Sequence, residues 1–160
     1  MERKKAAIYS KEEVSKSTVF KALWGNRYRK YYGTEVTAPV VNLDTLYGGL
    51  EFLKLGGGHQ SKSLHFKTKS GKRYVVRALR KSATVYLQAI AFKDQYIEGQ
   101  FEGTITEDLL LDFYTGSHPY APFVTGGLSD AVNLYHTNPV LYYVPKQKAL
   151  QHFNADFGDE

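Results

Sequence analysis

The 160-residue sequence contains no cysteine, one methionine and one tryptophan. Without cysteine the chain has neither a disulfide framework nor a cysteine-rich zinc site, and this absence fits reducing and oxidising compartments alike. No apolar run approaches the roughly 20 residues that a membrane-spanning helix needs. The opening MERKKAAIYSKEE also has no apolar core typical of a secretory signal. We therefore expect the chain itself to be soluble and to carry no signal peptide.

The overall composition is that of a folded protein, with 42% apolar and 23% charged residues and a length that suits one domain. The net charge of +5 is unevenly distributed, because residues 1–32 carry nine lysines and arginines against three acids. Such a basic segment can contact nucleic acid, phosphates or an anionic membrane surface. The alternative is a solvated helix whose lysine stems cover apolar surface.

Residues 11–32 have the pattern of an amphipathic helix. Their apolar side chains recur at spacings that suit one helix face, and Gly25 is a typical helix end: Val14, Val19, Phe20, Leu23, Trp24. The sequence therefore predicts two units, a basic amphipathic N-terminal helix or arm over residues 1–32 and a single α+β domain over residues 33–160.

The predicted sheet occupies the middle of the chain. Residues 33–49 have the character of an extended arm, and residues 50–79 contain three segments typical of antiparallel strands. The glycine triplet connects the first two segments, and Ser70-Gly71 turns the chain between the second and third. We expect a small antiparallel meander here.

Helices are expected mainly after the sheet. A short helix is predicted within residues 82–103, a further one around residues 128–132, and a strand over residues 139–146. The clearest helix begins at Thr104, because Glu107 three residues later gives the pattern of a capping box. Its predicted apolar face consists of Ile105, Leu109, Leu110 and Phe113. This order favours an α+β fold, with a small antiparallel sheet packed with two or three helices.

The stretch GGGHQSKSLHF, residues 56–66, is the strongest candidate for a ligand site. Consecutive glycines let backbone N–H groups approach a phosphate closely, and the polar residues that follow supply further donors. The candidate residues are Gly56, Gly57, Gly58, Gln60, Ser61, Lys62 and Ser63. The stretch does not match the phosphate-binding loop of nucleotide hydrolases, because it lacks the Gly-Lys-Ser/Thr ending and a following helix. The alternative is a tight turn between two strands.

Two charged residues extend this candidate site. Arg77 falls on the third predicted strand and Glu107 on the later helix, an order that resembles the N-lobe of a protein kinase. The likeness is one of layout, since kinases have lysine at the strand position. Arg77 can equally pair with a carboxylate on the face of the sheet.

The sequence predicts no catalytic residue and no metal site. None of the five histidines has the spacing of a metal-ligand pair, and His118 and His136 are expected to cap turns. Residues Asp156–Gly158 have the sequence Asp-Phe-Gly, which binds metal in protein kinases. No His-Arg-Asp segment of the kinase catalytic loop precedes this triplet, so it is assigned no role. Tyr28, Tyr31 and Tyr32 alternate with basic residues in a way that suits either base stacking or packing, and no nucleic-acid motif accompanies them. We therefore expect no cofactor in this chain other than a phosphate or nucleotide ligand.

Several blocks, in the same order, resemble a segment of large metallophosphoesterase-related proteins of Bacteroidota: VVNLDTLYGGL, LGGGHQSKSLHF, YVVRALRKSA, LLDFYTGSHPYAPFV and LYHTNPVLYYVPKQKAL. In those proteins the segment follows a calcineurin-like phosphoesterase domain, and an outer-membrane β-barrel often ends the chain. The resemblance implies a non-catalytic accessory domain in the cell envelope whose partner is the rest of a larger polypeptide. The metal-binding pattern of the phosphoesterases has no counterpart here, so no catalytic residue is carried over.

Two other functions are compatible with the sequence. The sheet is also similar in layout to the N-lobes of HipA-like and lipid kinases, which would make the chain the ATP-binding half of an atypical phosphotransferase. Residues 1–32 would alternatively serve as a basic interaction module for an anionic membrane surface or nucleic acid. A nucleic-acid partner is not expected, and a cytoplasmic location stays open.

Overall fold

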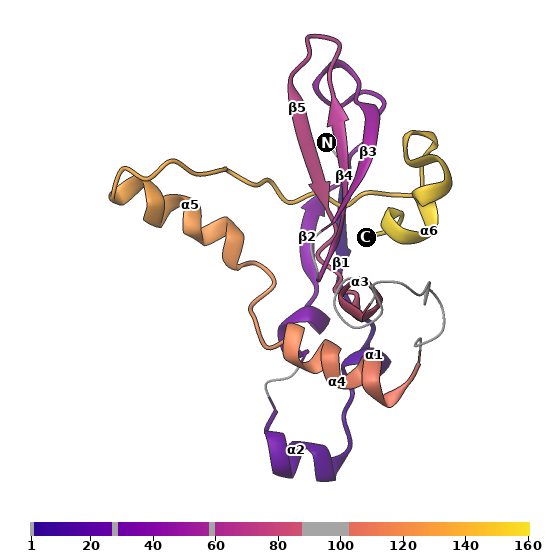
Figure 1. The fold of residues 1–160 in the computed structure, drawn as a ribbon, viewed down its shortest axis with the longest axis vertical. Coiled ribbons are helices and arrows are strands. Elements are labelled where there is room, and N and C mark those ends of the chain that lie inside the picture. The colour runs from indigo at the N-terminus through magenta and orange to yellow at the C-terminus, as the bar shows by residue number, and fades with distance from the viewer. Residues whose placement is uncertain (1, 27–28, 58–59, 88–102) are drawn as a thin grey trace.

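The computed structural model describes residues 2–26, 29–57, 60–87 and 103–160, and it is an α+β fold (Figure 1). Its strands are β1 Arg3–Ala6, β2 Val36–Pro39, β3 Glu51–Gly57, β4 Lys62–Lys67 and β5 Arg73–Arg77. Its α-helices are α1 Lys11–Val14, α2 Thr18–Trp24, α3 Ala83–Tyr86, α4 Ile105–Tyr114, α5 Ala121–Ala131 and α6 Asn154–Phe157. Three short 3-10 helices complete the described elements: η1 Lys30–Gly33, η2 Leu46–Gly48 and η4 Lys148–Phe153.

The predicted meander is confirmed. Strands β3, β4 and β5 form an antiparallel sheet in that order, and residues paired across strands share one face. The inner face carries the apolar side chains: Phe52, Leu64, Phe66, Tyr74, Val76. The outer face carries mostly glycine, polar and basic residues together with Val75, and Gly56, Ser63 and Arg77 form one row across the three strands.

The C-terminal segment covers the inner face of the sheet. Leu150 in η4 is fully buried, and Phe157 in α6 joins the same core, together with Val41 and Leu43 of the extended arm. Gln147 ties these parts together, because its side chain accepts a hydrogen bond from the Leu43 N–H and donates one to the Val41 carbonyl. Phe157 of the Asp156–Gly158 triplet thus contributes to the core.

The single helix expected within residues 11–32 is wrong. The chain forms two short helices instead. The first ends at Val14 with extended backbone at Ser15, and Ser17 caps α2 by accepting a hydrogen bond from the Phe20 N–H. Gly25 does end α2, as predicted. Strand β1, which the sequence did not indicate, pairs with β2 ahead of these helices.

Helix α4 is confirmed, but most of its predicted apolar face is not buried. Ile105 is 88% exposed and Phe113 is 71% exposed, so most of the apolar face points to solvent. The buried residue of α4 is instead Asp112, which faces basic side chains from the N-terminal segment. The reason is electrostatic, because this carboxylate pairs with Lys16 and Arg29.

Helix α5 extends beyond the predicted residues 128–132 and projects sideways from the rest of the molecule (Figure 1). The chain then returns in an extended conformation. The strand expected over residues 139–146 is reduced to one parallel bridge between Val40 and Tyr143. Of the helix predicted within residues 82–103, α3 is observed, and residues 88–102 lie outside the described part. Among the described residues, no helix is long and apolar enough to cross a membrane.

Candidate functional site at the glycine-rich connection

The glycine-rich stretch connects two antiparallel strands. Gly56 and Gly57 end β3, where they pair with Ser63 and Lys62 of β4, and Gly58 lies outside the described residues. The stretch therefore joins two adjacent antiparallel strands, whose pairing reaches Gly57 and Lys62. A ligand site here has to be built from the side chains around this hairpin.

Close packing explains why glycine occupies position 56. A Cβ atom there would overlap the His65 imidazole and would lie 2.8 Å from Ser63 Oγ. Ser63 is almost completely buried and His65 is partly buried, so neither neighbour lies in open solvent. Gly56 thus leaves room for the His65 ring on the outer face of the sheet.

Gln60 holds the connection against the chain that follows β5. Its carbonyl oxygen accepts a hydrogen bond from the Ser82 N–H at 2.9 Å, and its side-chain Oε1 accepts one from Lys81 Nζ at 3.5 Å. The Ala78 N–H donates to the Lys62 carbonyl at 3.1 Å in the same region. The end of β5 and the residues after it consequently form one wall beside the hairpin.

Two cations lie together on this wall. Arg77 is exposed and stands opposite Ser63, and it forms no ion pair with any described carboxylate. Lys81 likewise has no carboxylate partner among the residues described. Burial lowers the pKa of Lys81, and the positive charge of Arg77 lowers it further. An anion placed between the two groups would relieve this repulsion.

The other predicted ligand residues have different roles. Lys62 forms an ion pair with Asp156 of α6 at 2.6 Å, which fixes the hairpin to the C-terminal segment. Ser61 is buried. The structure therefore leaves Gln60, Arg77 and Lys81 as the side chains able to face a ligand beside the glycines.

Glu107 does not join this group. Its backbone N–H donates to Thr104 Oγ1, and its carboxylate accepts a hydrogen bond from the Gly103 N–H at 2.7 Å, so it caps the start of α4. No ion pair links it to Arg77. The arginine–glutamate pair that a kinase-like layout would require is thus absent from the described residues.

Acidic partners neutralise part of the charge on the basic N-terminal segment. Lys5 pairs with Glu35 at 2.8 Å, and Lys16 pairs with Asp112 at 3.0 Å. Arg29 is buried against Asp112 and also pairs with Asp108. These contacts show an internal role for several of the basic residues that suggested an interaction arm.

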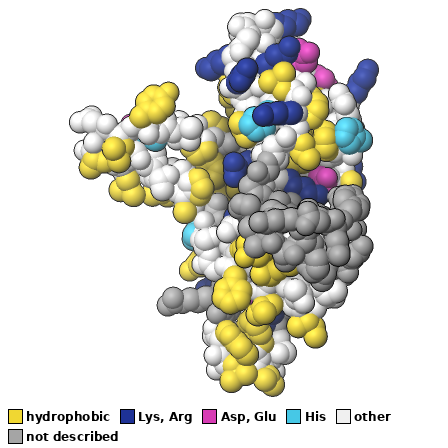
Figure 2. Space-filling view, in the orientation of Figure 1, with side chains coloured by type: hydrophobic (Ala, Val, Ile, Leu, Met, Phe, Trp, Pro, Cys, Tyr) yellow, Lys and Arg dark blue, Asp and Glu magenta, His cyan; other side chains and the backbone are white. Residues whose placement is uncertain are grey.

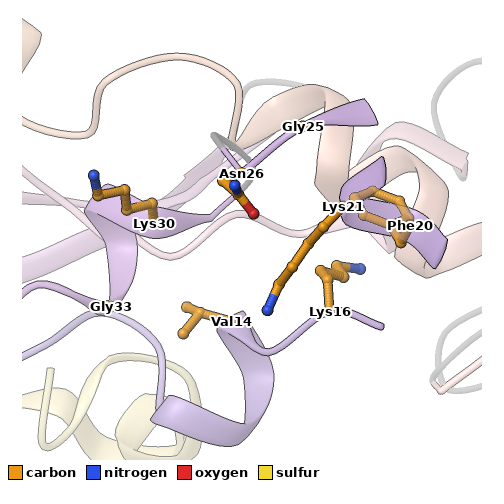
Figure 3. Close-up of a pocket in the computed structure, with 8 residues that line it drawn as sticks. All are labelled: Val14, Lys16, Phe20, Lys21, Gly25, Asn26, Lys30 and Gly33. Carbon is orange, nitrogen blue, oxygen red and sulfur yellow. The ribbon is translucent and has the colours of Figure 1, made fainter. Parts of the chain in front are cut away.

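A shallow hollow nevertheless lies among the N-terminal helices (Figure 3). Three lysines contribute to its lining: Lys16, Lys21, Lys30. Lys21 reaches toward Val14 in Figure 3, whereas the Lys30 amine points away from the other labelled side chains. Because Lys16 already pairs with Asp112 and the Lys30 amine points away, the three lysines do not converge on a common site for an anion.

The sequence analysis missed a second basic region. Residues 50–81, which form the three-stranded sheet and its connections, contain nine lysines and arginines but only one acid, Glu51. The signal was present as a simple charge count along the chain. The net charge of the whole chain conceals it, because the much more acidic segment after residue 81 balances it. Lys81, which the prediction left out of the site, belongs to this region.

No group of three or more potential metal-binding His, Asp or Glu side chains occurs within the described residues. The arrangement of the described residues around the hairpin is suited to binding an anion through charge and hydrogen bonds. No protein family, curated protein or solved structure matches this chain.

Proposed function

We propose that the chain is a non-catalytic accessory domain that binds a phosphate group beside the glycine-rich connection. The observation that carries this proposal is the pair of neighbouring cations, Arg77 and Lys81, without a described carboxylate partner. Gln60 adjoins Lys81 and offers its amide to the same anion. A phosphate accepts several hydrogen bonds, and its negative charge would pair with both cations.

Exposed apolar side chains support the accessory role. Three helices present large apolar groups to solvent, among them Leu23 and Trp24 on α2, Phe113 on α4 and Leu128 on α5. Contiguous exposed apolar surface is uncommon on monomers and favours contact with another protein surface. The parent that the sequence blocks favour is a cell-envelope polypeptide related to metallophosphoesterases, whose remaining part would cover these helices.

Thermal unfolding with added anions tests the phosphate site. The chain is heated with sodium phosphate, with ATP and Mg²⁺, or with sodium chloride at matched ionic strength. A ligand present at a hundred times its Kd stabilises the folded state by about 2.7 kcal/mol. For a chain of this length, that raises the Tm by roughly 5–10 °C. We expect this shift with phosphate and its loss in the double variant Arg77→Gln, Lys81→Gln.

The matched control removes two exposed charges elsewhere, through Lys11→Gln and Lys21→Gln. This control should keep the phosphate shift, because both residues lie in the N-terminal helices. Equal melting temperatures in phosphate and chloride would refute the site. A shift with ATP that inorganic phosphate does not reproduce would favour the ATP-binding half of a phosphotransferase instead.

A further inference from the structure

A second cluster of cations occupies the opposite end of the three-stranded sheet. It surrounds the turn between β4 and β5 and consists of Lys67, Lys69, Lys72 and Arg73. Arg73 and Arg77 are four residues apart on one strand, which separates them by about 13 Å. Figure 2 shows Lys and Arg side chains gathered at this end of the molecule, above the helices. The cluster is thus distinct from the proposed phosphate site.

Hydrogen bonds within residues 68–72 fix the turn that carries these cations. The Thr68 N–H donates to the Lys72 carbonyl at 2.9 Å, and Thr68 Oγ1 lies 2.8 Å from Ser70 Oγ. Gly71 adopts a positive φ of 84°, which glycine allows without strain. The basic side chains therefore project from a defined hairpin.

Most of these charges are uncompensated. Lys67 pairs with Glu51 at 3.2 Å, and Glu51 is the one acid in residues 50–81. Lys69 and Arg73 are exposed and have no ion pair with the described carboxylates, and the same holds for Lys54 on the outer face. The end of the sheet thus carries a net positive charge that can attract an extended anionic surface.

The side chains between the cations favour lipid over single-stranded nucleic acid. Val75 lies between Arg73 and Arg77 on the outer face, and Leu53 is exposed at the edge strand β3. By contrast, the aromatic residues of β4 and β5, Phe66 and Tyr74, belong to the inner face. Bases would need outward aromatic rings for stacking, whereas aliphatic groups among lysines and arginines suit a lipid headgroup layer.

We propose that the β4–β5 turn and the outer face of the sheet bind an anionic membrane surface. Each lysine or arginine near such a surface is attracted to it, and salt screens the attraction. This proposal does not depend on the phosphate site, because Lys54, Lys69 and Arg73 carry it. Nor does it depend on the N-terminal segment, whose charges are partly paired internally.

Vesicle sedimentation tests the proposal. The full chain is mixed with vesicles of phosphatidylcholine containing about one third phosphatidylserine, or of phosphatidylcholine alone, at low and high salt. We expect binding to the anionic vesicles that salt weakens. The triple variant Lys54→Gln, Lys69→Gln, Arg73→Gln should reduce the partition coefficient about tenfold or more, since each charge contributes separately. Circular dichroism checks that the variant is folded.

The matched triple variant Lys11→Gln, Lys21→Gln, Lys30→Gln removes the same charge from the N-terminal segment and should lower the partition coefficient much less. Equal losses in the two variants would overturn the proposal, because net charge alone would then explain binding. Binding to a single-stranded oligonucleotide at lower concentration than to anionic vesicles would assign the surface to nucleic acid instead. The phosphate-induced thermal shift should persist in the sheet variant, which separates this proposal from the first.

Discussion

Arg29 and Asp112 form an ion pair in which each side chain is only 6% exposed, although 82 residues separate them along the chain. Arg29 Nε lies 3.0 Å from Asp112 Oδ1, and a second guanidinium nitrogen reaches the exposed carboxylate of Asp108 at 2.9 Å. Neither Arg29 Nε nor Asp112 Oδ1 makes a well-aligned hydrogen bond, so the contact between them is mainly electrostatic. This pair links the N-terminal segment to α4.

Removing one partner of this pair should therefore be costly. We expect Asp112→Ala to lower the free energy of unfolding by about 3–5 kcal/mol, because it leaves the Arg29 charge buried without its main counterion. Asp108→Ala is the control and should cost less than about 1 kcal/mol, since that side chain is 62% exposed. Urea denaturation measures both. Similar losses of unfolding free energy in the two variants would show that the buried Arg29–Asp112 pair stabilises the fold no more than the exposed contact with Asp108.

Gly56 should resist substitution for a reason of space. Gly56→Ala places a methyl group against the His65 ring and Ser63 Oγ, and such overpacking costs about 1–3 kcal/mol. The added change His65→Ala should recover part of this loss by removing the ring. The same glycine-to-alanine change at Gly127 is the control: an added Cβ meets nothing within 4 Å inside α5, so stability should rise slightly. A Gly56→Ala variant as stable as wild type would argue against this packing.

Truncating an apolar side chain should cost much less stability on the exposed face of α4 than in the core. Leu150→Ala should lower the free energy of unfolding by about 2–5 kcal/mol, because Leu150 is fully buried among the sheet residues. Phe113→Ala should change it by less than about 0.5 kcal/mol, since the ring is largely exposed. Thermal or urea unfolding of the isolated chain compares them. A large loss with Phe113→Ala would place α4 over the core after all.

The segment after α5 should respond to pH. The imidazole of His136 has acceptors at both nitrogens, Asp130 Oδ1 at 2.8 Å from Nε2 and the Thr137 carbonyl at 3.1 Å from Nδ1. The pKa of His136 is raised above its ordinary 6.5, mainly by the hydrogen bond to Asp130 and to a smaller extent by the one to Thr137. When it is protonated, the ring donates a hydrogen bond to each acceptor and so connects the end of α5 to the turn that follows.

The sign of the pH effect follows from this raised pKa. The stabilisation from His136 is fully present below the unfolded pKa and is lost as pH rises through the higher folded pKa. An NMR titration of the His136 ring should show the raised value, and Asp130→Asn should bring it down. A titration midpoint that Asp130→Asn leaves unchanged would contradict the assigned partner.

The sheet could be predicted from sequence because its signals are local. Alternating residues from Ser63 to Lys67, the Ser70-Gly71 turn and the β-branched run after Arg73 mark two strands and their connection. The N-terminal helix could not be predicted correctly, because the apolar spacing continues across Ser17 while the serine itself caps a new helix. Local capping there overrides a pattern that spans several turns.

The candidate site was predicted only in part. Glycines and an arginine on a strand are visible in the sequence, but the neighbourhood of Arg77 and Lys81 depends on how the chain leaves β5. The orientation of α4 also depends on residues far away in the sequence, since Asp112 of this helix pairs with Arg29 of the N-terminal segment. Periodicity identifies a helix face that is apolar, and it does not identify what lies opposite.

The cover of the sheet by Leu150 and Phe157 has a consequence for synthesis. Residues 50–79, which form all three strands, are synthesised about 70 residues before the segment that buries their inner face. At about 5–20 residues per second, the nascent sheet waits several seconds with Leu64 and Phe66 uncovered. During that interval the growing chain presents the apolar side of its sheet to other proteins, so chaperone binding should concentrate on nascent chains that contain residues 50–79 but lack residues 150–157.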